Sequence, residues 1–128
     1  MRVKLLRLAA VTVAAAVALV GLSGVAGSRE VIKAVENDSG GWSWDPATVH
    51  DAHKGEKAIW RDTSGVSHTV KFYKGKYKGL VLSLPANESV SKRMRKTGFH
   101  RYRCSIPGHA EMKDGDCISG MCGAIHVQ

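Results

Sequence analysis

The chain has 128 residues, 44% of them hydrophobic and 23% charged, with 19 Lys and Arg against 11 Asp and Glu and a formal net charge of +8. This length allows one domain and excludes a large multidomain enzyme. The balance of apolar and charged residues is that of a globular protein, which argues against a disordered chain, a collagen or a coiled coil.

Residues 1–27 have the layout of a secretory signal peptide. Arg2, Lys4 and Arg7 are the only charged residues among the first 28, and residues 8–26 are almost purely apolar or small. A basic start, an apolar middle and small residues before a cleavage point are typical of an export signal. An uncleaved amino-terminal anchor is the alternative, because the apolar run approaches the length of a membrane span. We therefore expect an exported protein that is periplasmic, extracellular or associated with the outer side of a membrane.

The rest of the chain divides into a short connection and a domain. Residues 28–41 include the polar run Asn37-Asp38-Ser39-Gly40-Gly41 and are interpreted as a linker, and residues 42–128 as the folded domain. In this domain, short segments rich in Val, Trp, Tyr and Phe alternate with turn residues. The expected strands cover residues 47–49, 57–62, 66–73, 80–84, 89–96, 98–104 and 123–127. About seven short strands in 100 residues predict an all-β sandwich or barrel.

Two of the expected strands point chemically active side chains toward the core. His68 alternates with apolar residues on one face of the segment 66–73, and Cys104 shares a face with Tyr102 in the segment 98–104. His109 and two methionines, Met112 and Met121, lie between the last two expected strands. A thiolate, two imidazoles and a thioether are the ligands of a blue-copper electron-transfer site.

Several motifs are similar to those of one known family, and they cover nearly all of residues 42–128. They are residues 44–49 (WDPATV), 60–62 (WRD), 67–70 (SHTV), 102–109 (YRCSIPGH) and 121–127 (MCGAIHV), together with Gly98. The chain resembles the cupredoxins, which include plastocyanin, pseudoazurin and azurin. The resemblance implies a Greek-key antiparallel β-sandwich or barrel of about seven or eight strands that holds one type 1 copper ion. It also implies that His68, Cys104 and His109 are the equatorial ligands.

The axial ligand departs from the family pattern. Cupredoxins usually place this methionine a few residues after the second histidine and just before the last strand. Met121 precedes such a strand but follows His109 by 12 positions, whereas Met112 has the short spacing and no strand-like sequence after it. We favour Met121, with Met112 as the alternative, because entry into a strand fixes where a side chain points. Residues 110–120 then contain an insertion.

The remaining cysteines and two polar residues are expected to support the site. If Cys104 binds copper, Cys117 and Cys122 are left as a pair in an oxidising compartment, and we expect a disulfide between them. The family usually has asparagine at the position that we assign to Asp62, where it steadies the ligand loop near the cysteine sulfur. We expect Asp62 and Ser105 to lie beside the ligands, and the charge on Asp62 to favour Cu(II). A simply solvated Asp62 is the alternative.

Three functions compete on these features. The leading hypothesis is a small exported electron carrier, monomeric and not itself an enzyme, that passes one electron between redox partners. A copper carrier or buffer that delivers copper to another protein is the alternative. A structural zinc domain is a remote third, with the ligands Cys104, His109, Cys117 and Cys122.

The basic residues suggest possible partners. Lys and Arg in residues 71–78 and 92–103 form either a solvated face or a docking surface for an acidic redox protein or an anionic membrane. We expect no nucleic-acid partner.

Overall fold

The computed structural model describes residues 30–128, and the predicted signal peptide lies outside them. Eleven strands are present in this range. They are β1 (Val31–Glu36), β2 (Trp42–Asp45), β3 (His50–Ala52), β4 (Lys57–Asp62), β5 (His68–Lys74), β6 (Val81–Leu84), β7 (Ser89–Arg93), β8 (Gly98–Arg103), β9 (Ala110–Lys113), β10 (Asp116–Gly120) and β11 (Cys122–Val127). Within residues 30–128 there is no helix with the length and apolar character needed to span a membrane.

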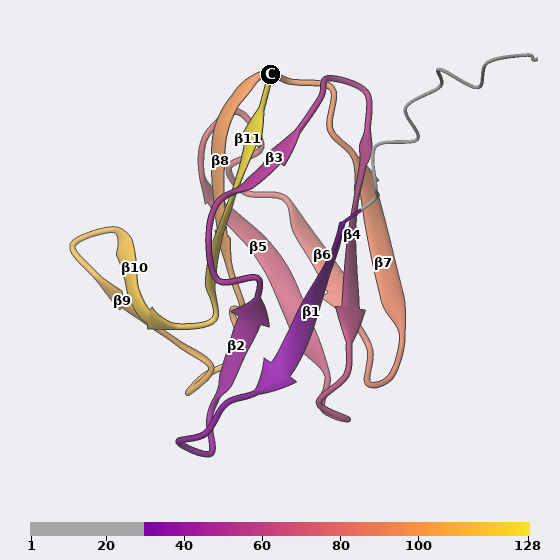
Figure 1. The fold of residues 1–128 in the computed structure, drawn as a ribbon. Coiled ribbons are helices and arrows are strands. Elements are labelled where there is room, and N and C mark those ends of the chain that lie inside the picture. Colours follow the sequence, from indigo (N-terminus) through magenta and orange to yellow (C-terminus); the bar gives the residue numbers. More distant parts are fainter. Residues whose placement is uncertain (1–29) are drawn as a thin grey trace, which may run out of the picture.

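Two sheets lie face to face, and a separate hairpin stands beside them (Figure 1). The strand order is β2-β1-β4-β7 in one sheet and β3-β11-β8-β5-β6 in the other, and β9 pairs only with β10. The pairs β1–β4 and β3–β11 are parallel, and the remaining pairs are antiparallel. The predicted all-β sandwich is confirmed. Six of the expected strands are present, and five observed strands, β1, β2, β3, β9 and β10, were not foreseen.

The predicted linker over residues 28–41 is wrong for residues 31–36. These residues form β1, which lies between β2 and β4, and its Ile32 and Ala34 side chains are fully buried. The alternation of buried and exposed residues in VIKAVE is that of a half-buried strand. Only residues 37–41 form the polar turn, in which the Asn37 side chain accepts hydrogen bonds from two backbone N–H groups. The domain therefore begins before residue 42.

The expected strand at residues 47–49 is also misplaced, because the structure has β2 before it and β3 after it. Both neighbouring strands add to the sandwich. The Trp44 side chain of β2 is 1% exposed, whereas the Val49 side chain between the strands is 49% exposed. Asp45-Pro46 and the residues after it thus form the connection from one sheet to the other, and the β propensity of Val49 did not decide its conformation.

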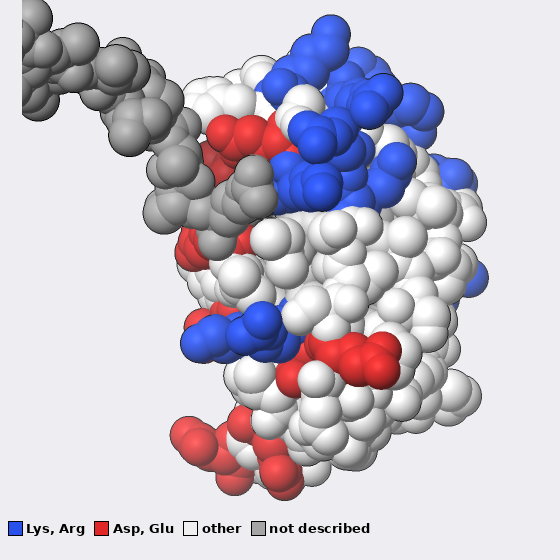
Figure 2. All heavy atoms as spheres, turned by 90° about the vertical axis from the view of Figure 1, so that its right-hand side faces the viewer, with Lys and Arg blue, Asp and Glu red and all other residues white. Residues whose placement is uncertain are grey.

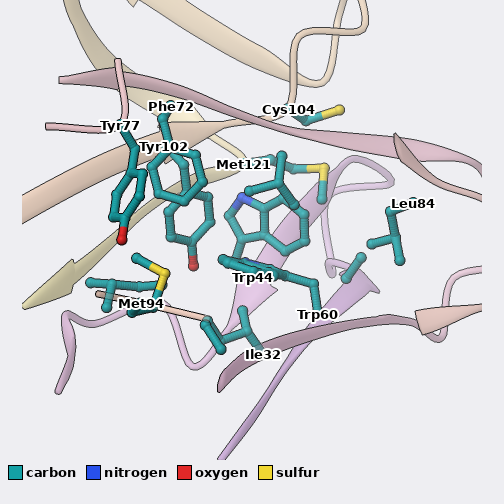
Figure 3. Close-up of a cluster of buried hydrophobic side chains, with 14 of the residues drawn as sticks. Ile32, Trp44, Trp60, Phe72, Tyr77, Leu84, Met94, Tyr102, Cys104 and Met121 are labelled. Carbon is teal, nitrogen blue, oxygen red and sulfur yellow. The ribbon is translucent and has the colours of Figure 1, made fainter. Parts of the chain in front are cut away.

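A cluster of aromatic side chains fills the space between the sheets (Figure 3). The Tyr102 ring lies at the centre of this cluster, with ring centroids 5.5 Å from Trp60, 5.6 Å from Trp44 and 5.7 Å from Phe72. Gly123 on β11 faces Tyr102 across the strand pair, and a Cβ atom there would collide with the Tyr102 ring. The absence of a side chain at Gly123 therefore lets this ring lie directly against the backbone of β11. The rigid core fixes β5, β8 and β11, the three strands that carry or adjoin the functional side chains.

Candidate metal centre

Three buried donor side chains meet at one end of the sandwich. His68 is the first residue of β5, Cys104 directly follows β8, and His109 ends the loop after it. His68 Nδ1 lies 3.0 Å from His109 Nδ1, while Cys104 Sγ lies 3.6 Å from His109 Nδ1 and 4.0 Å from His68 Nδ1. Together, these three side chains form a group of donors that could hold one metal ion. The structure thus brings together the three predicted equatorial residues, which are 41 positions apart at their extremes.

The size of this triangle fits a first-row transition metal. The point equidistant from three atoms with these separations lies about 2.1 Å from each, close to the bonds of roughly 2.0–2.3 Å that imidazole nitrogen and thiolate sulfur make to such ions. One soft sulfur and two imidazole nitrogens in a trigonal arrangement are the donors preferred by copper in electron-transfer sites. Both the geometry and the donor chemistry of His68, Cys104 and His109 therefore fit a copper ion.

Burial keeps the two imidazoles in the form that binds metal. Removal from water disfavours the charged imidazolium and lowers the pKa of both His68 and His109. At His68 this effect exceeds the opposing influence of the Asp62 carboxylate. The second ring nitrogen of His68, Nε2, lies 2.8 Å from Ser64 Oγ and 3.4 Å from Asp62 Oδ1. These contacts orient the ring so that Nδ1 faces the other two donors.

Asp62 lies beside the ligands, as expected. Its buried carboxylate accepts hydrogen bonds from the N–H groups of Ser64, Gly65 and Asn87 and faces His68, with no hydrogen bond to Cys104. Burial alone raises the pKa of Asp62, but these donors outweigh it and the pKa is lowered. Asp62 therefore organises the loop before β5 as an ionised group.

The hydrogen bonds to the cysteine sulfur come from Thr69, which we did not single out. The Thr69 N–H group lies 3.4 Å from Cys104 Sγ, and Thr69 Oγ1 lies 3.9 Å from the same atom. Thr69 Oγ1 also accepts a hydrogen bond of 2.8 Å from the Ser105 N–H and lies 2.7 Å from Ser105 Oγ. Thr69 immediately follows His68 in the quoted SHTV motif, and this adjacency to a ligand was the available signal. Ser105, as expected, lies beside the site.

The two candidate axial methionines have different environments. Met121 is fully buried, and its backbone N–H donates to the His109 carbonyl at 2.9 Å while its carbonyl accepts from the Cys104 N–H at 3.2 Å. Figure 3 shows its side chain beside Cys104, above the indole ring of Trp44. Met112 is half-buried on β9, in the hairpin that stands apart from the sandwich in Figure 1. The backbone links favour Met121.

The expected insertion at residues 110–120 is the β9–β10 hairpin. Asp114 and Gly115 both have positive φ angles, 52° and 80°, as in the tight turns that Asp-Gly sequences favour. We had regarded the sequence after Met112 as unlike a strand, and this turn is the reason that it pairs after all. At the hairpin base, a Cβ atom on Gly120 would collide with the His109 carbonyl. Gly120 thus permits the close approach that connects Met121 to His109.

Cys117 and Cys122 form a disulfide, and Cys104 is the free cysteine of the described residues. The bond joins β10 to the first residue of β11 and spans Met121. Oxidised sulfur atoms cannot serve as thiolate ligands. The zinc hypothesis, which required Cys117 and Cys122 with Cys104 and His109, is therefore contradicted by the structure.

The outer side of His109 is covered by Trp42, another residue that we had not singled out. The two rings stack with centroids 4.1 Å apart and an angle of 21° between their planes. On another side, His109 borders a surface hollow of about 360 Å³ between the ligand loop and the hairpin, lined in part by Ala110 and Ser119. His109 remains 7% exposed. It is therefore the donor nearest to solvent, since His68 and Cys104 are 1% and 0% exposed.

Comparison with solved structures places this site in a known architecture. A purple cupredoxin from Nitrosopumilus maritimus aligns over 77% of this chain and 98% of its own, with a TM-score of 0.53 and 16% identity. The reduced state of an amicyanin variant aligns over 81% and 86%, with a TM-score of 0.54 and 17% identity. The chain has the cupredoxin fold. No protein-family model matches the sequence, and neither does any curated protein.

The cupredoxin fold that the motifs implied is therefore confirmed. A third similar structure, the reduced Cu(I) form of another amicyanin variant at pH 4, has a TM-score of 0.55 and 18% identity over 81% of this chain. At these identities the comparisons establish the cupredoxin fold, and the function has to be argued from the donor triangle.

Proposed function

We propose that this protein is an exported electron carrier that holds one type 1 copper ion between His68, Cys104 and His109, with Met121 as the axial ligand. The observation that carries the proposal is the buried triangle of one sulfur and two nitrogen atoms, whose dimensions suit a single first-row metal ion. The cupredoxin neighbours support it, since two of them are described as reduced and one of these as a Cu(I) form.

The protein's contribution to electron transfer is to keep the ligands still. A copper ion at this position would supply a couple between Cu(I) and Cu(II). His68 is held from behind by Ser64 and Asp62, Cys104 by the Thr69 N–H, and Met121 by two backbone hydrogen bonds. Because these supports do not depend on the ion, the donor positions should change little between the two oxidation states. Fast transfer follows from this small rearrangement.

We propose that electrons enter and leave through the His109 side of the site. His109 is the most exposed donor, and the stacked Trp42 ring and the adjacent hollow give a redox partner a surface within contact of a ligand. Weak redox encounters use small interfaces, so this limited surface is sufficient. A suitable partner would be a redox protein that can bring its own cofactor close to the His109 side of the site.

Location outside the cytoplasm is supported by two independent features. The amino-terminal residues have the pattern of an export signal. A disulfide joins Cys117 and Cys122, and such bonds persist in oxidising compartments. We therefore assign the protein to the periplasm, the extracellular space or the outer side of a membrane.

Voltammetry of the copper-loaded full chain, combined with a chelator challenge, tests electron transfer against copper delivery. We expect a reversible one-electron wave, together with copper retention over hours, because every donor is buried and supported. The metal-free protein is the control and should give no wave. Exchange of copper within minutes, without a reversible wave, would contradict the proposed electron-transfer function and favour a function in copper delivery.

A further inference from the structure

Lys and Arg residues gather at the end of the sandwich opposite the metal centre. Figure 2 shows a dense group of Lys and Arg at the upper end of the molecule, bordered on its left by Asp and Glu atoms, with further Asp and Glu groups lower down. We define the basic end as the basic residues of the segments 53–58, 76–80 and 92–97. They are Lys54, Lys57, Lys76, Lys78, Lys92, Arg93, Arg95 and Lys96. Glu56 is the one acidic residue in these three segments.

The strand directions show that the basic end and the metal centre are far apart. β5 begins with the ligand His68 and ends at Lys74, just before the basic end, so its seven residues separate the two by about 20 Å. β7 runs antiparallel to β4, which places Arg93 beside Lys57 at the same end of the sheet. A protein docked on the basic end would thus hold its cofactor at least this far from the donor triangle.

Within the basic end, four lysines line one hollow of about 340 Å³ together with Tyr77 and Leu80. They are Lys76, Lys78, Lys92 and Lys96. The ammonium groups of Lys92 and Lys96 lie 5.4 and 5.2 Å from the centroid of the Tyr77 ring. The Tyr77 hydroxyl accepts hydrogen bonds from the N–H groups of Arg95 and Lys96, at 2.7 and 3.0 Å. The ring is therefore a fixed platform for two of the four charges.

These four charges have no acidic partner among residues 30–128. The ion pairs of this part of the chain include Lys74 and Arg101, which share Asp116, but none of the four lysines of the hollow. Lys96 instead donates to the backbone carbonyl of Lys76 at 3.3 Å. Like charges gathered without a counter-charge repel one another, and a bound anion with several oxygen atoms relieves that repulsion. Lysine ammonium groups are common ligands of phosphate.

We propose that the basic end docks on an anionic phospholipid bilayer, with a headgroup phosphate in the lysine hollow and the metal centre facing away from the membrane. Anionic leaflets attract basic clusters through many weak contributions. An acidic redox protein is the less suitable occupant, since it would dock about 20 Å from the donors. β1 runs parallel to β4, away from the basic end, so its first residue, Val31, lies at that end. This docking does not depend on which metal the site holds.

Vesicle sedimentation of the full chain tests the proposal. Phosphatidylcholine vesicles measure any contribution of the apolar amino-terminal run, and the extra binding to vesicles that also contain phosphatidylglycerol measures the anionic contribution. The double variant Lys92→Gln/Lys96→Gln should lower this anionic contribution about tenfold, since each lysine near a charged leaflet contributes several-fold. The matched control Lys33→Gln/Lys113→Gln removes two exposed charges outside the basic end and should change it less than twofold.

Several results would overturn the docking site. One is an equal loss in both double variants, which would mean that only net charge matters. Another is the absence of any extra binding to anionic vesicles. A third is saturable binding of inorganic phosphate or of a soluble acidic protein to the hollow without vesicle binding, which would assign it to another ligand. The variant Lys92→Arg/Lys96→Arg should retain vesicle binding, and an unchanged melting temperature of the Gln variant would show that it is folded.

Discussion

Thr69 supports the metal centre with its backbone and its side chain separately. Its N–H group points to Cys104 Sγ, while its hydroxyl receives the N–H of Ser105. Because Cys104 and Ser105 are adjacent, Thr69 fixes the start of the ligand loop at two consecutive residues. The Ser105 N–H is partly buried, and such a group is costly without an acceptor, so the Thr69 hydroxyl contributes to stability as well as to position.

We predict that Thr69→Val lowers the free energy of unfolding by about 1–3 kcal/mol, because the Ser105 N–H loses its acceptor. Valine keeps the backbone N–H that faces the sulfur. Denaturant unfolding of the metal-free protein measures the change. Thr97→Val is the control, since the exposed Thr97 hydroxyl contacts only the Lys76 ammonium group, and it should have almost no effect. Equal stability of the two variants would disprove the role of Thr69.

Replacement of the two methionines distinguishes the axial ligand. We predict that Met121→Leu raises the reduction potential of the copper form, because removal of a weak axial donor disfavours Cu(II) relative to Cu(I). Met112→Leu should leave the potential unchanged, since Met112 lies out on β9. Voltammetry of both variants provides the comparison. A shift in Met112→Leu alone would reverse the assignment.

At the scale of elements, the β9–β10 hairpin lengthens the ligand loop while three connections fix its ends. The disulfide joins β10 to β11, Gly120 allows Met121 to reach His109, and Asp116 pairs with Lys74 of β5 and Arg101 of β8. An insertion beside a metal ligand would otherwise loosen it, because a longer loop has more conformations to lose. The connections therefore let the loop grow without freeing Met121.

The ion pair of the hairpin predicts a dependence on pH. The hydrogen bond from Lys74 lowers the pKa of Asp116 below its ordinary value. A lowered pKa means that this connection is complete above about pH 3.8 and is lost as the pH falls through the lower folded-state value. Titration of the Asp116 carboxyl by NMR should show a higher pKa in Lys74→Gln and no change in Lys78→Gln. An unchanged pKa in Lys74→Gln would contradict the connection.

The elements differ in how far the sequence predicted them. β4 was predicted with its observed bounds, and the inward faces of β5 and β8 correctly included His68 and Tyr102. β1 was missed because the polar turn after it masked a six-residue alternation. The contact between Thr69 and Cys104 could not be predicted, because it depends on the lateral pairing of β5 and β8 rather than on any local pattern.

At the scale of the whole molecule, the basic end and the donor triangle lie at opposite ends of the sandwich. The donor triangle lies where β5 begins, and the lysine hollow lies beyond the end of β5. Charges interact weakly beyond about 8 Å at physiological ionic strength, so the basic end has little influence on a partner at the metal centre. From the sequence alone, the basic residues formed either a solvated face or a docking surface for an acidic redox protein or an anionic membrane. In the structure, the lysine hollow and the donor triangle are two separate surfaces, and we propose a different task for each.

This separation predicts which variants affect electron transfer. Lys92→Gln/Lys96→Gln should change the second-order rate of electron exchange with a soluble redox protein by less than about twofold at physiological salt. Trp42→Ala should change that rate more, because it alters the surface that covers His109. Stopped-flow measurements on the copper form compare the two. A large loss of rate in the lysine variant alone would place the partner on the basic end.

The absorption and electron paramagnetic resonance spectra of the copper-loaded protein test the central claim most directly. A copper ion bound by a thiolate and two imidazoles should give an intense blue charge-transfer band from the Cys104 sulfur. That band should vanish in Cys104→Ser and persist in Met112→Leu. A colourless Cu(II) complex of the wild-type protein would contradict the account.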